Sequence, residues 1–116
     1  MSQTSRERVA RNQAAYRKIN EAIRAGSDDA NSGPRAFVCE CALIGCNELV
    51  EMTLADYEAI RGNSERFVIF PGHDVPDAER VVAETDEGAV VVEKDSDLAP
   101  ITRGLDERRQ PRRDRS

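Results

Sequence analysis

Three cysteines and one histidine occur in this chain, and their spacing suits a metal ion. Cys39, Cys41 and Cys46 form a C-x-C-x4-C pattern, and His73 follows after twenty-six intervening residues. Three thiolates and one imidazole complete the tetrahedral shell of a structural zinc, whereas a catalytic zinc keeps one position open. The sequence therefore predicts one structural Zn²⁺ on these four residues, with metal binding coupled to folding.

Three other interpretations of these residues stay open. Cysteine is often a small buried side chain, so the set could be three core thiols and a surface histidine. Cys46 and His73 could form an activated thiolate pair, and Cys39 with Cys41 could act as a redox dithiol. No orienting group is recognisable beside the first pair, and no thioredoxin-like βαβ pattern surrounds the second. We therefore predict no enzymatic activity and assign no catalytic residue.

The ligands need elements that bring them together, and the hydrophobic pattern predicts an α+β fold. Residues 36–98 are expected to form a small zinc-stabilised body in the order β-β-α-β-β-β. Thr53 is the predicted N-cap of its helix, and Pro71 with Gly72 ends the clearest strand just before His73. The expected strands lie near 36–38, 48–52, 67–70, 81–82 and 89–92, with a helix at 54–61 and a hairpin turn at 86–88. All four ligands then lie at strand ends or in adjoining loops, and Gly45 permits a tight turn before Cys46.

Residues 1–25 are predicted to form an amphipathic helix, and residues 26–35 a linker. Thr4 or Ser5 supplies a cap, and Gly26 a stop. An apolar stripe with one amide falls at helical spacing along one side of this helix: Val9, Asn12, Tyr16, Ile19 and Ile23. We expect the stripe to pack on the helix's own domain. A docking or dimerising helix is the alternative, because the stripe is narrow and close to a 3.5-residue repeat.

Charge is distributed unevenly around a net charge of −5. Residues 1–25 carry six basic and two acidic side chains, residues 26–102 five basic and seventeen acidic, and residues 103–116 six basic and three acidic. The acidic body argues against a nucleic-acid surface on the folded part, whereas the basic arm and tail leave such a role open. Residues 99–116 are charged and poor in apolar side chains, so we predict a disordered basic tail.

The location of the protein is expected to be cytoplasmic. No segment reaches the ~18–20 apolar residues of a membrane span, and the first residues lack the apolar stretch of a secretory signal. An odd number of cysteines also fits poorly with a disulfide framework. We therefore expect reduced thiols and no membrane association.

Several short motifs relate the chain to a known group of proteins. They are Cys39-Glu40-Cys41 with Cys46, Met52-Thr53-Leu54, Pro71-Gly72-His73 and Val91-Val92-Glu93-Lys94. In these motifs the chain resembles short, uncharacterised bacterial proteins, common among actinobacteria, that pair an N-terminal helix with a C-E-C…C and a P-G-H motif. The resemblance covers about residues 7–94. It implies that the helix belongs to the module, and it brings no activity with it.

The function favoured by the sequence is a small non-enzymatic zinc-binding module that mediates protein–protein interaction, with a regulatory role as a hypothesis. The expected partner is therefore another protein. A nucleic-acid-associated protein that uses its basic arm and tail is one alternative. A thiol or redox protein that uses the C-x-C motif is the other.

Overall fold

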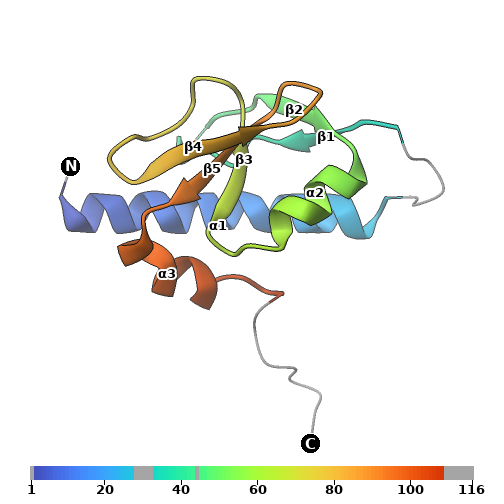
Figure 1. Ribbon diagram of the computed structural model, residues 1–116. Helices are drawn as coiled ribbons and strands as arrows, with labels where there is room; N and C mark the ends of the chain where they lie inside the picture. Colours follow the sequence, from blue (N-terminus) through green and yellow to red (C-terminus); the bar gives the residue numbers. More distant parts are fainter. Residues whose placement is uncertain (1, 28–32, 44, 109–116) are drawn as a thin grey trace, which may run out of the picture.

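The computed structural model describes residues 2–27, 33–43 and 45–108 of the 116-residue chain. They form an α+β fold in which one long helix runs along two small antiparallel sheets (Figure 1). The predicted fold class and the β-β-α-β-β-β order of the body are confirmed. The elements are α1 (Gln3–Ala25), β1 (Arg35–Val38), β2 (Leu49–Met52), α2 (Leu54–Arg61), β3 (Arg66–Ile69), β4 (Glu79–Glu84), β5 (Val90–Lys94), the 3₁₀-helix η1 (Ser96–Leu98) and α3 (Ala99–Gly104).

The two sheets share one hydrophobic core. β1 pairs with β2, and the second sheet has the strand order β3-β5-β4, with every pairing antiparallel. Phe37 of β1 stacks on Tyr57 of α2, with 4.7 Å between the ring centroids. Val68 of β3 and Val91 of β5 belong to the same buried cluster. Burial of these side chains therefore fixes α2 and both sheets as one unit.

Local signals place several boundaries where the sequence predicts them. The helix α2 spans the expected residues, and the Thr53 hydroxyl accepts the Asp56 N–H at 3.1 Å as its N-cap. Gly88 has a φ of +92° in the turn between β4 and β5, a conformation that glycine adopts readily. In the predicted linker, residues 28–32 lie outside the described residues, and Arg35 already begins β1.

The helix α1 packs on its own domain, as predicted, through a face that coincides only in part with the predicted stripe, because Val9 is buried and Ile23 packs against the core. Ser2 caps it, slightly earlier than expected, by accepting the Ser5 N–H. Ile19 of the predicted stripe is 46% exposed. The residues that α1 buries are Val9, Ala10, Gln13, Ala14, Arg17 and Asn20. Polar side chains can be buried there because distant parts of the chain supply their hydrogen-bond partners, which a pattern of apolar spacing does not reveal.

The C-terminal prediction is wrong for residues 99–108. This stretch begins with α3 and continues to Asp106, which is buried. The Asp106 carboxylate accepts hydrogen bonds from Arg61 at 2.6 Å and from Ser64 at 2.6 Å. Arg108 forms ion pairs with carboxylates of α1 and α2. The composition of this stretch predicts disorder. The partners that order it lie more than forty residues away in sequence, so they leave no local signal. Residues 109–116 of the predicted tail lie outside the described residues.

Candidate metal centre

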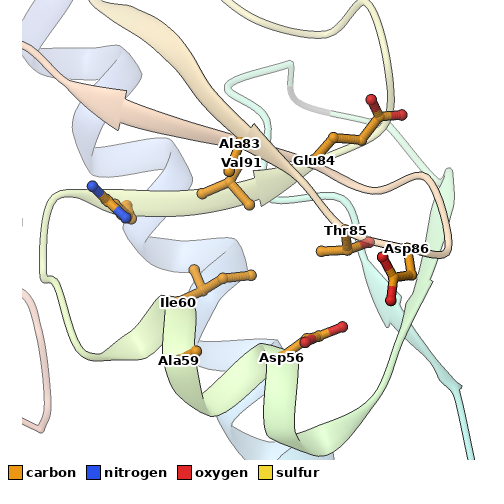
Figure 2. A pocket seen from close by; sticks show the side chains of 9 residues that line it. Asp56, Ala59, Ile60, Ala83, Glu84, Thr85, Asp86 and Val91 are labelled. Atoms are coloured by element: carbon orange, nitrogen blue, oxygen red, sulfur yellow. The ribbon is translucent and has the colours of Figure 1, made fainter.

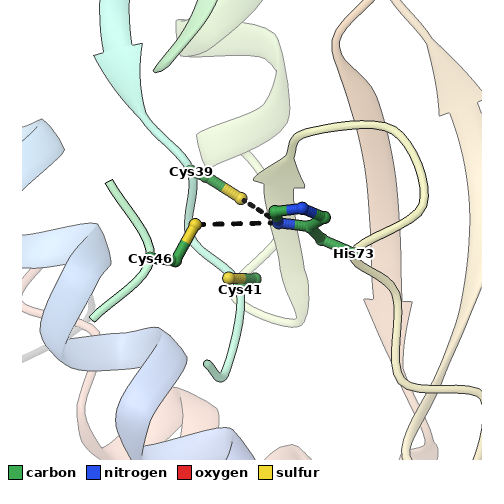
Figure 3. Close-up of side chains that lie close together, drawn as sticks. All are labelled: Cys39, Cys41, Cys46 and His73. Carbon is green, nitrogen blue, oxygen red and sulfur yellow. Dashed lines mark hydrogen bonds between the residues drawn. The ribbon is translucent and has the colours of Figure 1, made fainter. Parts of the chain in front are cut away.

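The four predicted ligands lie together in the folded chain. The Sγ atoms of Cys39, Cys41 and Cys46 and a ring nitrogen of His73 all lie within 4.8 Å of one another. The His73 Nδ1 atom is 3.5 Å from the Cys39 Sγ and 3.7 Å from the Cys46 Sγ (Figure 3). The three cysteines form no disulfide. The sequence therefore identified a set of side chains that converge on one point.

A tight turn after β3 presents the histidine. The His73 N–H donates to the Phe70 carbonyl at 3.1 Å, with Pro71 and Gly72 between them. Gly72 has a φ of +89°. Proline at the second and glycine at the third position define a type II turn, in which glycine relieves the strain of a positive φ. This turn redirects the chain, as the sequence predicts, so that the imidazole reaches the cysteines.

A second turn presents Cys46. Its N–H donates to the Leu43 carbonyl at 3.1 Å, and Gly45 has a φ of +91°. The helix α1 holds this loop from outside. The Gly45 N–H donates to the Tyr16 hydroxyl at 3.2 Å, and the Asn12 side-chain amide donates to the Ala42 carbonyl at 3.4 Å. Two members of the predicted apolar stripe therefore position the ligand loop.

Glu40, which lies between two ligands, fixes the C-x-C segment to the neighbouring strand. Its backbone N–H donates to the Val68 carbonyl at 2.8 Å, and its carboxylate accepts the Val68 N–H at 3.0 Å. The other carboxylate oxygen accepts from Asn20 of α1 at 2.7 Å. Glu40 is only 1% exposed, so its hydrogen bonds form inside the protein. The sequence does not reveal this role, since an acidic residue between cysteines carries no signal of burial.

The side chain of Asn20 pairs with the backbone at the end of β1, as a neighbouring strand would. Its side-chain Oδ1 accepts the Val38 N–H at 2.8 Å, and its Nδ2 donates to the Val38 carbonyl at 2.9 Å. One amide side chain thus satisfies both backbone groups of the residue just before Cys39. This contact orients the end of β1 toward the site.

Without a bound cation, the surroundings of Cys39 and Cys41 favour neutral thiols over thiolates. Burial raises the pKa of Cys39 to about 12 and also raises the pKa of Cys41. The Phe70 N–H nevertheless donates to the Cys39 Sγ at 3.1 Å, a contact that stabilises a negative sulfur. Converging thiols, an imidazole and a backbone donor aimed at sulfur fit a thiophilic cation, whose charge would offset the cost of burying thiolates.

The same geometry gives little support to thiol chemistry. A reactive cysteine needs a lowered pKa, whereas Cys39 and Cys41 have raised values. His73 lies almost equally close to Cys39 and Cys46 rather than serving one of them. Among the described residues, no carboxylate forms a hydrogen bond with the His73 ring to orient it as a base. The arrangement therefore fits a set of metal ligands better than a nucleophile with its general base.

A separate hollow of about 270 Å³ lies between α2 and the second sheet (Figure 2). Asp56 and Asp86 face it from α2 and from the turn after β4. Its other lining residues are Ala59, Ile60, Arg66, Ala83, Glu84, Thr85 and Val91. None of these is a cysteine or histidine, so the hollow is distinct from the metal centre.

Comparison with known proteins adds no relative. No protein-family model, no curated protein and no solved structure matches this chain. None of the helices among the described residues is both long and apolar enough to cross a membrane. The resemblance to the actinobacterial group therefore stays a prediction.

Proposed function

We propose that this chain is a small structural-zinc module that acts without catalysis as a protein-binding unit of the bacterial cytoplasm. The observation that carries the proposal is the convergence of four ligand atoms within 4.8 Å. Thiolate-rich tetrahedral sets favour Zn²⁺, whereas Mg²⁺ and Ca²⁺ require oxygen ligands. Reduced thiols, which the ligand set requires, persist in the cytoplasm.

A structural rather than catalytic role follows from the number of ligands. Four protein ligands fill a tetrahedral zinc shell and leave no position for water or substrate. Cys39 follows β1, and His73 follows β3, so a shared ion would join strands of the two sheets. Because these ligands are distant in sequence, their metal-binding energy would act as folding energy.

Exposed apolar side chains near this centre support a role in protein binding. Leu43, in the ligand loop, is 65% exposed, and Leu49, at the start of β2, is 56% exposed. Apolar surface on a small domain is a common feature of interaction sites. A regulatory role for such binding is a hypothesis that follows from the small size and the absence of a predicted catalytic residue.

A second candidate function is nucleic-acid binding, and one observation favours it. Arg8, Arg11 and Lys18 are exposed on α1 and pair with no described carboxylate. Phosphate binding by these cations would depend steeply on salt concentration. The surplus of acidic side chains in residues 26–102 opposes it, so we rank it below protein binding.

Metal content is the direct test of the proposal. Protein purified without an affinity-column metal should contain about one zinc per chain by elemental mass spectrometry. His73→Ala should lose most of this zinc, whereas His73→Cys, which restores a fourth ligand, should retain it. X-ray absorption at the zinc edge should find three sulfur ligands and one nitrogen. A metal-free protein with three freely alkylated thiols would refute the proposal.

A further inference from the structure

An apolar groove with an acidic rim lies beside the metal centre. It has a volume of about 260 Å³ and lies between β2, the turn after β3 and the turn between β4 and β5. Glu51 and Glu87 are exposed at its rim, and neither side chain forms a hydrogen bond or ion pair with a described residue. Its other lining residues are Leu49, Val50, Phe70, Pro71, Gly88 and Ala89. This groove could hold one aliphatic side chain with cations on either side.

The outer face of α1 has the complementary chemistry. Arg8, Arg11 and Lys18 are exposed there, and none of their side chains forms a hydrogen bond or ion pair with a described residue. Every other arginine or lysine in the described part of the chain has an interaction within the protein. The exposed side chain of Ile19 lies next to Lys18 in sequence. Two turns of helix separate Arg11 from Lys18, about 10.5 Å along the axis. The face therefore combines unpaired cations with one exposed aliphatic residue.

We propose that the groove of one chain binds the outer face of α1 of a second copy. Ile19 of one copy enters the groove of the other, and Arg11 and Lys18 lie near Glu51 and Glu87 at its rim. The four charged side chains in the contact, which lack partners within one chain, then each lie near a charge of opposite sign. Because the two surfaces differ, copies can associate head-to-tail into rings or open chains, or can exchange the contact reciprocally in a two-fold dimer. A groove of this size makes the contact weak and reversible.

The apolar groove favours a second copy of this chain over nucleic acid as the binding partner. Phosphates would neutralise the cations of α1 but would leave Ile19 and the apolar groove without a partner. A second copy satisfies both surfaces at once, using charges that are already present in this chain. Nucleic acid therefore serves as an alternative outcome of the test.

The metal centre and the groove share a wall. Phe70 and Pro71 line the groove and begin the turn that carries His73. In this one respect the inference rests on the proposed function, because a bound ion would fix that turn. The metal would then shape the binding surface without contacting the partner.

The test uses sedimentation velocity on the full chain and two variants with reversed charge. Wild type should associate as its concentration rises, and added salt should weaken the association. Arg11→Glu/Lys18→Glu should weaken it about tenfold or more, and so should Glu51→Lys/Glu87→Lys. An equimolar mixture of the two variants should recover association, because an altered surface then meets one of opposite charge. Arg80→Glu/Arg103→Glu, with the same change in net charge as the first variant, is the control; it breaks two exposed ion pairs elsewhere and should associate as wild type does.

Several results would overturn the inference. A wild type that stays monomeric up to about 1 mM has no such contact. A mixture that fails to recover association would show that charge pairing does not define it. Binding of a short DNA duplex that Arg11→Glu/Lys18→Glu abolishes, without self-association, would assign the α1 face to nucleic acid.

Zinc measured in the same samples separates the two proposals. Zinc-loaded protein that does not associate refutes the self-association alone. Metal-free protein that associates and shows the charge-reversal pattern refutes the zinc module alone.

Discussion

Two buried polar clusters in this protein differ in how their charge is balanced. In the metal centre, three thiols and an imidazole converge, and no lysine or arginine is among these side chains. In the second cluster, the Glu79 carboxylate accepts from Lys94, from Gln13 at 3.0 Å and from the Val75 N–H at 2.9 Å. Lys94 and Glu79 are both almost fully buried. The first cluster has no cation of its own and is suitable for a metal ion, whereas the second cluster balances its buried carboxylate with its own lysine.

Removal of the metal should have the largest effect on this comparison. Structural zinc contributes about 10 kcal/mol or more to folding in small zinc domains, so a strong chelator should unfold much of the body. Cys39→Ser should do the same without chelator. Circular dichroism during zinc titration measures the effect. An apo-protein that keeps its folded spectrum and its cooperative melting would contradict it.

Breaking the self-sufficient cluster should have the next largest effect. Lys94→Met leaves the Glu79 carboxylate buried without its cation, which we expect to cost about 3–5 kcal/mol of unfolding free energy. Urea unfolding of zinc-loaded protein measures this loss. The matched variant Glu79→Gln/Lys94→Met removes both charges and should recover most of the stability. If the single variant were as stable as wild type, the cluster would not depend on its ion pair.

The C-terminal contact provides a pH-dependent test. Although burial raises it, hydrogen bonds from Arg61 and Ser64 lower the pKa of Asp106 to about 2. A folded pKa below the unfolded value of 3.8 stabilises the protein above that pH, and the gain is lost as pH falls toward 2. Asp106→Asn should therefore cost about 2 kcal/mol at pH 7.

The measurement for Asp106 is urea unfolding of both proteins across this pH range. The difference between wild type and Asp106→Asn should shrink as the solution is acidified. The neighbouring Glu107 is exposed, so Glu107→Gln is the control and should change stability by less than about 0.5 kcal/mol. A difference that stays constant with pH would mean that the charge of Asp106 is not what stabilises the contact.

The turn that carries His73 should give the smallest effect. Gly72 has a φ of +89°, and a Cβ there would meet no atom within 4 Å, so Gly72→Ala strains only the backbone. We expect a loss of about 1 kcal/mol and weaker zinc retention in competition with a chelator. Gly104→Ala, at a glycine without positive φ, is the control. Equal zinc retention in both variants would show that the turn is not strained by a side chain.

Short sequence signals predict the helix boundaries and turns of this structure that depend on neighbouring residues. Thr53 beside a helical pattern predicts α2, and Pro71-Gly72 before His73 predicts the turn that aims the imidazole. The four ligands are recognisable because cysteine and histidine are rare here and their number matches a tetrahedral shell. Such signals depend only on a few residues, so they can be recognised without knowledge of the fold.

Only the tertiary structure decided which face of α1 is buried and whether the C-terminal stretch is ordered. Arg17 is buried because it donates to the carbonyls of Ser64 and Thr102 and lies over the Phe67 ring. Asp106 is ordered because Arg61 lies opposite it. Sequence by itself determined where donors could converge on a metal. The fold determined the rest, because a polar or charged side chain is buried only where distant residues satisfy it.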